Sequence, residues 1–132
     1  MPLEFVKKIQ NSYPNFVFRA GKKFAFRPPK TIIFEDVPDG EALLLHELGH
    51  ALLGHRDFKT EPERLKMEVA AWEKARELAK EYAVEIDEDL IQTELDTYRD
   101  WLHIKSRCPR CGLTRYQTPD GKYHCPRCEN LD

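Results

Sequence analysis

Residues 31–55 read TIIFEDVPDGEALLLHELGHALLGH, and this stretch does most to decide the fold of the chain. Its β-forming start, Thr31–Glu35, predicts a short strand, and Asp36–Gly40 predicts a turn after it. The apolar residues that follow predict a helix that runs to about Leu53, where Gly54 ends it. The stretch therefore predicts a strand, a turn and a helix that carries HELGH.

HELGH places His46 and His50 four residues apart on the predicted helix, so both side chains point the same way. Two imidazoles in this arrangement can bind one zinc ion. Glu47 lies beside them and is the expected general base that takes a proton from the attacking water, which excludes it as a zinc ligand. The motif therefore predicts a zinc-dependent hydrolase, most often a peptidase.

A catalytic zinc ion usually has three protein ligands, so the two histidines require a partner. The helix predicted over Glu61–Glu85 carries a stripe that is apolar from Leu65 to Tyr82 except at Glu68. A carboxylate on such a stripe is costly unless it is paired or binds a metal. We therefore expect Glu68 to be the third ligand. The alternatives are that Glu68 lies at the edge of the stripe or forms an ion pair with an arginine such as Arg64.

His55 is the rival for the third position, because it follows directly after Gly54 and can turn back toward the metal. The spacing of HELGHALLGH differs from that of the long metzincin motif, in which a third histidine binds zinc. We expect His55 instead to cap the end of the helix, where the dipole is negative. His103 and His124 are not expected to bind the catalytic metal.

The four cysteines form two CPRC pairs, Cys108 with Cys111 and Cys125 with Cys128, and thirteen residues separate the pairs. This spacing predicts a Cys₄ zinc ribbon rather than disulfides. The metal would supply the folding free energy of a segment that is too small for its own core. Rubredoxin-type iron is the weaker alternative. The expected cofactors are thus two zinc ions, one catalytic and one structural.

The predicted fold class is α+β, with a small N-terminal sheet packed on the HELGH helix and the glutamate-bearing helix. The chain of 132 residues suits one domain with an appendage. We divide it into a zincin-like metallopeptidase domain, residues 1–104, and a zinc ribbon, residues 105–132. The other expected elements are a helix over Leu3–Gln10, a hairpin formed by Asn15–Arg19 and Lys23–Arg27, and a helix over Glu88–Ile104.

Composition and charge limit the classes of partner. Hydrophobic residues make up 41% and charged residues 33%, as in ordinary globular domains. The sequence has no apolar run near the roughly 20 residues of a membrane span and no signal peptide, so we expect a cytoplasmic protein without membrane contact. Residues 105–132 carry a net charge of +3, which falls to +1 with four thiolates and Zn²⁺. That charge alone does not argue for nucleic-acid binding. The ribbon can bind a protein or DNA partner, or it can only pack on the main domain.

Once His46, Glu47, His50 and Glu68 are assembled, the chain resembles the gluzincin metallopeptidases, most closely the ImmA/IrrE-like proteins and minimal gluzincins. The resemblance rests on residues 31–55 and on MEVAAWEKA, residues 67–75. It implies zinc between two helices of a mixed fold, and proteolysis, sometimes of a transcriptional repressor and sometimes latent. The chain differs in its cysteine tail and in lacking an obvious helix-turn-helix domain.

Two further readings remain open. SprT-like metallopeptidases also combine HExxH with a C-terminal zinc ribbon and act around DNA, but their third ligand is a downstream histidine, here His55 or His103. A non-catalytic zinc-binding regulator, which uses the ribbon to bind a partner, is the other. For a peptidase that acts on a peptide or protein, Thr31–Glu35 is either the edge along which the substrate extends or an internal strand.

Overall fold

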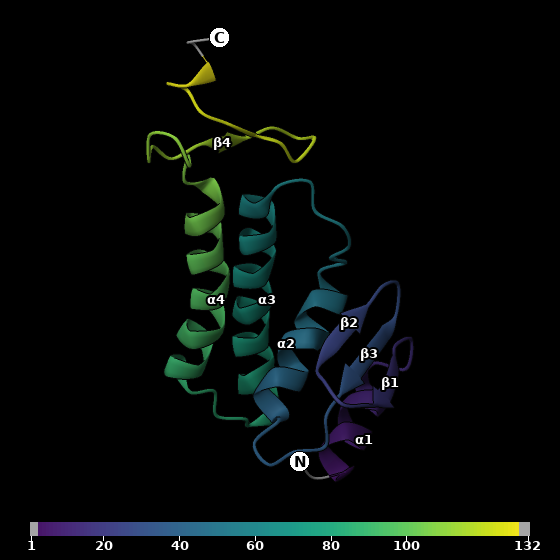
Figure 1. Ribbon diagram of the computed structural model, residues 1–132. Helices are drawn as coiled ribbons and strands as arrows, with labels where there is room; N and C mark the ends of the chain where they lie inside the picture. The colour runs from purple at the N-terminus through teal and green to yellow at the C-terminus, as the bar shows by residue number, and fades with distance from the viewer. Residues whose placement is uncertain (1–2, 130–132) are drawn as a thin grey trace. The chain divides into compact units, whose positions relative to one another are not determined.

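The structure is a computed structural model and describes residues 3–129. Within that range it is a mixed α+β structure with four helices and two small sheets (Figure 1). The α+β class predicted from the sequence is thus confirmed. The elements are α1 (Leu3–Ser12), β1 (Val17–Ala20), β2 (Ala25–Arg27), β3 (Thr31–Phe34), α2 (Glu41–Leu52), α3 (Glu61–Tyr82), α4 (Glu88–Ser106), β4 (Tyr116–Gln117) and β5 (Tyr123–His124).

Contacts between Cα atoms group the chain into two compact units. The first unit contains the chain up to Arg56 together with Val69–Asp87, and the second contains Asp57–Glu68 together with the chain from Glu88 onward. Helix α3 contributes its first turns to the second unit and the rest to the first. This grouping places the cysteine segment with α4; the division at residue 104 into two domains stays a prediction.

The sheet of the first unit has the strand order β1-β3-β2, so β3 is its central strand. Ile32 lies opposite Phe18 of the parallel strand β1 and opposite Phe26 of the antiparallel strand β2. Alternate residues of β3, Ile32 and Phe34, are buried, whereas β1 is largely exposed. Burial on one face explains why the most apolar strand takes the central position.

The predicted hairpin between residues 15–19 and 23–27 is wrong, because β3 lies between these two segments. The residue directly after β1 still pairs with β3, because the Gly21 N–H donates to the Phe34 carbonyl at 2.8 Å. The hairpin is instead formed by β2 and β3 around Pro28–Lys30. Of the two readings of Thr31–Glu35, the internal strand is correct, and a substrate cannot add to it.

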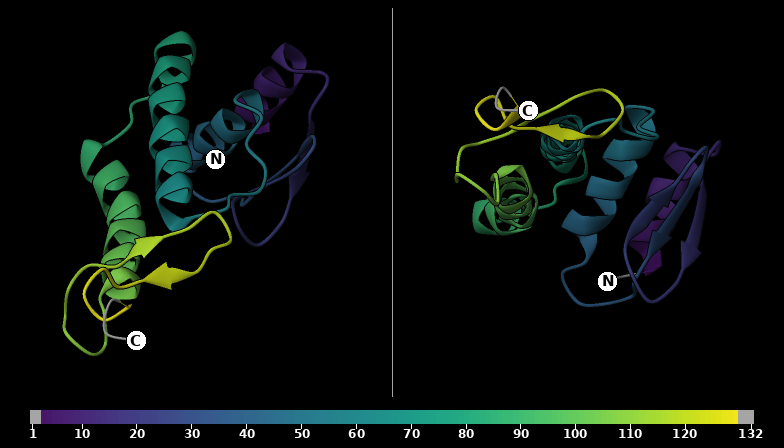
Figure 2. Two further views of the ribbon diagram at one scale, coloured as in Figure 1. Left: turned by 90° about the horizontal axis from the view of Figure 1, so that it is seen from above. Right: turned by 45° about the horizontal axis from the view of Figure 1, so that its top comes forward.

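Helix α2 lies between the sheet and α3 in the views of Figures 1 and 2, and its contacts with β2 and β3 agree with this. Three leucines of α2 are fully buried, as are Ile32 of the sheet and Trp72 of α3. The largest buried side chains of this unit are Trp72, Ile9, Ile32, Leu44, Leu45 and Leu48. The core therefore surrounds α2, the helix that carries HELGH.

The ends of the helices agree with the expected boundaries to within a few residues. Helix α2 ends at Leu52, and Gly54 takes a left-handed φ of 68°. Helix α3 stops at Tyr82, earlier than expected, because Ala83 turns into the left-handed region with φ 55°. Among residues 3–129, the structure contains no helix with the length and apolarity that crossing a membrane requires.

Candidate metal centres

His46 and His50 occupy neighbouring turns of α2, and both are buried, with 7% and 9% of their surface exposed. Their Nε2 atoms approach to 3.2 Å. Two nitrogens bound to one tetrahedral zinc ion at about 2.0–2.1 Å lie about 3.3–3.4 Å apart. The two rings are thus already placed as a pair of ligands to one metal ion.

Gly49, between the two histidines in HELGH, allows α2 and α3 to cross closely. A Cβ atom at this position would lie 2.6 Å from the carbonyl oxygen of Ala71, far inside van der Waals contact. One residue after Ala71, the Trp72 indole stacks on the His46 ring, with centroids 4.2 Å apart and an angle of 20°. This crossing fixes α3 against the face of α2 that carries the histidines.

Glu68 lies one turn before Trp72 on α3, and this position brings it to the histidines. The ligand atoms of His46, His50 and Glu68 lie within 4.8 Å of one another. Glu68 is half-buried, while the apolar stripe behind it is buried from Ala71 onward. The three residues form a group that can hold a metal ion, and it is the group expected from the sequence.

Tyr98 of α4 contacts Glu68 through a side-chain hydrogen bond. Burial, together with the negative charge of Glu68 and a hydrogen bond to it, raises the pKa of Tyr98 to about 12, against the opposing effect of Arg64. The Arg64 guanidinium lies over the rings of Phe58, Tyr98 and Trp101 at 5.2, 4.9 and 5.2 Å. The contact of Tyr98 with Glu68 has no local sequence signal.

His55 contacts His50 rather than joining the ligand group. Its backbone N–H donates to the His50 carbonyl at 3.0 Å, at the end of α2, and capping by its ring stays a prediction. Its ring, which we expect from the sequence to cap the helix end, lies with Nδ1 2.8 Å from Nδ1 of His50. The two ring nitrogens of His50 thus face different partners, Nε2 toward His46 and Nδ1 toward His55.

The remaining candidates have other surroundings. Glu47 is half-buried on α2 beside His46. His103 is exposed on α4. His124 contacts Glu129 at 2.5 Å and stacks on Tyr116. Of these three, Glu47 alone lies in the HELGH helix, which fits a role next to the metal rather than on it.

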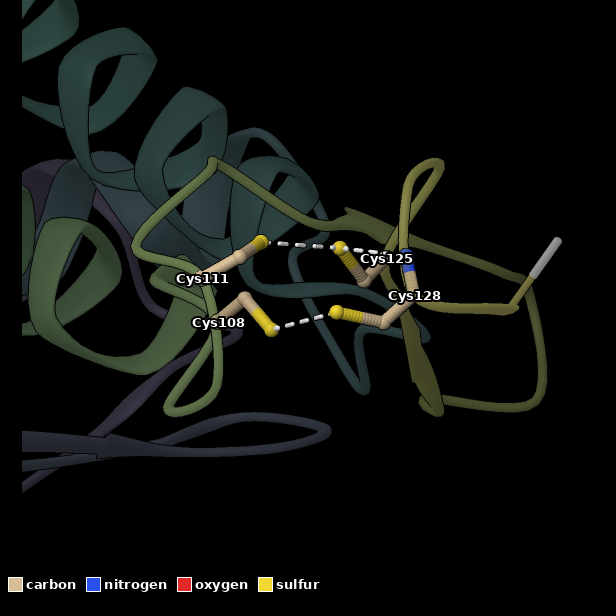
Figure 3. Close-up of side chains that lie close together, drawn as sticks. All are labelled: Cys108, Cys111, Cys125 and Cys128. Carbon is tan, nitrogen blue, oxygen red and sulfur yellow. Dashed lines mark hydrogen bonds between the residues drawn. The ribbon is translucent and has the colours of Figure 1, made fainter. Parts of the chain in front are cut away.

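The four cysteines form the second metal-binding group (Figure 3). Cys108 Sγ lies 3.8 Å from Cys128 Sγ, and Cys111 Sγ lies 3.5 Å from Cys125 Sγ. Sulfurs bound to one tetrahedral zinc ion at about 2.3 Å lie about 3.8 Å apart, whereas a disulfide requires about 2.05 Å. The cysteines are free thiols placed to bind one metal ion.

Backbone N–H groups prepare two of the thiols for metal binding. The N–H groups of Cys111 and Arg110 lower the pKa of Cys108 to about 6, and those of Cys128 and Arg127 lower the pKa of Cys125. Burial and the neighbouring thiols raise the pKa of Cys128 to about 12. Four thiolates in this space repel one another, so a bound cation is needed to hold all four ionised.

The cysteine segment is anchored to the other elements of the second unit. Gln117 of β4 accepts a hydrogen bond at 2.5 Å from the N–H of Glu61, the first residue of α3. Lys105 forms an ion pair with Glu61 at 3.5 Å, and Arg115 donates to the Lys105 carbonyl at 2.6 Å. The ribbon therefore packs on the start of α3 and the end of α4, a contact that its sequence does not reveal.

The close crossing at Gly49 leads to a prediction about stability. Helix propensity alone would make Gly49→Ala stabilising by about 1 kcal/mol. Because the new methyl group meets backbone at Ala71, we expect destabilisation of about 1–3 kcal/mol and weaker metal binding at the histidines. Urea unfolding of the metal-free proteins measures this, and a stabilised variant would contradict the crossing.

Comparison with protein-family models, curated proteins and solved structures finds no match to this chain.

Proposed function

We propose that the chain is a zinc-dependent metallopeptidase of the gluzincin type, latent or narrowly specific, with His46, His50 and Glu68 as the ligands of the catalytic zinc. The observation that carries the proposal is the convergence of these three side chains within 4.8 Å around HELGH. Two histidines and one glutamate are a known ligand set of catalytic zinc, and they leave a position for water.

In the proposed reaction, Glu47 takes a proton from the attacking water and passes it to the leaving amine. A zinc ion bound by the three ligands would acidify that water and polarise the peptide carbonyl. The Tyr98 hydroxyl lies next to Glu68 and would hold its carboxylate in place.

The substrate strand in this proposal is not Thr31–Glu35, which is internal. Among the described residues, β2 pairs with β3 alone, so its other edge can accept an extended peptide. β2 also contacts α2, the helix that carries Glu47. A peptide paired with β2 would therefore lie beside the catalytic helix.

The SprT-like alternative takes a histidine as third ligand. The position of Glu68 and the contact between His55 and His50 both favour the glutamate. The second class of function is a non-catalytic zinc-binding regulator. It would use the same metal site as the peptidase but would not hydrolyse peptides. The net charge of the ribbon is weak, so it does not favour DNA over protein as the partner of the ribbon.

A metal count on wild type and Glu68→Ala tests the ligand set. We expect about two zinc ions per chain in wild type and about one in Glu68→Ala, because two histidines alone bind zinc too weakly to survive purification. Glu73→Ala, an exposed glutamate on the same helix, serves as control and should keep both. Elemental analysis against protein concentration gives the numbers.

About two zinc ions in both Glu68→Ala and wild type would move the third ligand elsewhere and favour the SprT-like reading. One zinc ion in wild type, removed only by cysteine substitution, would contradict the catalytic site. Two bound zinc ions in wild type without cleavage of any peptide would favour the non-catalytic zinc-binding regulator.

A further inference from the structure

We propose that His55 is a positioning residue that holds the ring of His50 in the orientation and tautomer that the metal requires. The inference rests on the proposed metal site, and it assigns a role to a side chain that the proposed reaction does not use. It is carried by the 2.8 Å contact between the Nδ1 atoms of His50 and His55.

The His50 ring is held at both of its nitrogens. Its Nε2 faces Nε2 of His46 at 3.2 Å, in the ligand group with Glu68. Its Nδ1, on the opposite side of the ring, faces His55, and the two rings meet at 64° with centroids 5.1 Å apart. Because Nε2 must stay free to bind metal, the Nδ1 contact is the one that can fix the ring.

The tautomers follow from this geometry. A neutral imidazole carries one proton, and the nitrogen that binds a metal must offer its lone pair. His50 therefore carries its proton on Nδ1 and donates it to Nδ1 of His55, which carries its own proton on Nε2. Such an outer hydrogen bond normally orients a metal-bound histidine and strengthens it as a ligand.

The backbone places His55 for this contact. Gly54 takes a left-handed φ of 68°, which reverses the chain after α2. The His55 N–H then donates to the carbonyl of His50, the same residue that its ring contacts, at 3.0 Å. Both contacts join His55 to His50, so the chain directly after the helix presents the His55 ring to its partner.

An imidazole differs from the usual partner of a metal-bound histidine, which is a carboxylate or a backbone carbonyl. A neutral acceptor adds no negative charge next to the metal. A zinc ion with Glu68 as its one charged ligand would keep a net positive charge within its ligand set, which helps it to lower the pKa of bound water. His55 thus orients His50 while it preserves the acidity of the site.

The test is the zinc affinity of the His/Glu site, measured by competition with a chromophoric chelator on the full chain. We expect His55→Ala to weaken this affinity by about 10–100-fold. His55→Asn, whose amide oxygen can accept the same hydrogen bond, should recover most of the loss. His103→Ala, an exposed histidine on α4, is the matched control. The ribbon site serves as an internal reference and should keep its affinity in every variant.

Affinity in His55→Ala within about twofold of wild type would overturn the inference. So would an asparagine variant as weak as the alanine variant, because the ring would then act only by filling space. The metal-free variants should unfold at the wild-type urea concentration, which separates positioning from a loss of fold. Wild type that binds zinc only at the ribbon would overturn both this inference and the proposed function. Tight zinc binding without peptide cleavage would leave this inference standing and favour the non-catalytic regulator over the peptidase.

Discussion

Glu47→Gln is expected to abolish peptide hydrolysis while both metal sites stay loaded. Glutamine has the same shape as glutamate but cannot take a proton from water, so the loss is that of a general base, about 10²–10⁴-fold in rate. Glu47 lies on α2 beside His46 and is half-buried, so an isosteric change there should leave the helix intact. The zinc content of the variant should equal that of wild type.

The measurement is the appearance of new peptide N-termini by mass spectrometry after incubation with a mixed peptide library. Glu41→Gln, a half-buried glutamate in the first turn of the same helix, is the control and should cleave as wild type does. Cleavage that continues at the wild-type rate in Glu47→Gln would contradict the mechanism. A loss of zinc together with activity would instead indicate that Glu47 supports the metal.

The parts of the fold that local patterns determine were predictable. The boundaries of α2 followed from the apolar run and Gly54, and the cysteine cluster followed from the repeated CPRC spacing. The strand order was not predictable. The turn residues around Gly21 suggest a hairpin, but the hydrogen bond from Gly21 to Phe34 joins segments that local sequence does not relate.

In the candidate site, too, some features follow from local sequence patterns and others do not. Glu68 was identified because a carboxylate interrupts an apolar stripe, and this signal follows from helix periodicity. The contact of Tyr98 with Glu68 and that of His55 with His50 depend on how separate segments meet, and on side-chain rotamers. Gly49 is an intermediate case. Its place in HELGH can be read from the sequence, but the close approach of Ala71, whose carbonyl oxygen would lie 2.6 Å from a Cβ atom at this position, cannot.

Cys111→Ser is expected to release the ribbon metal and unfold the cysteine segment. From Arg107 to Glu129 the buried residues are two cysteines, Cys108 and Cys125, whereas Leu113 and Tyr116 are 44% and 52% exposed. So little apolar burial cannot offset the chain entropy of the segment. Zinc binding, about 10–16 kcal/mol in comparable small sites, would supply most of its folding free energy.

The effect should reach α3, because the Glu61 N–H donates to Gln117 of the ribbon at 2.5 Å. When the ribbon unfolds, this amide at the start of α3 loses its acceptor, and its hydrogen exchange should become much faster, while amides of α2 keep their protection. Arg110→Ala, an exposed position in the same knuckle that keeps its backbone N–H, should retain the metal and the slow exchange. Unchanged protection at Glu61 in Cys111→Ser would mean that packing on α3 and α4, rather than the metal, holds the ribbon. Faster exchange that extends to Glu68 would mean that the ribbon also steadies the part of α3 that bears the proposed third ligand.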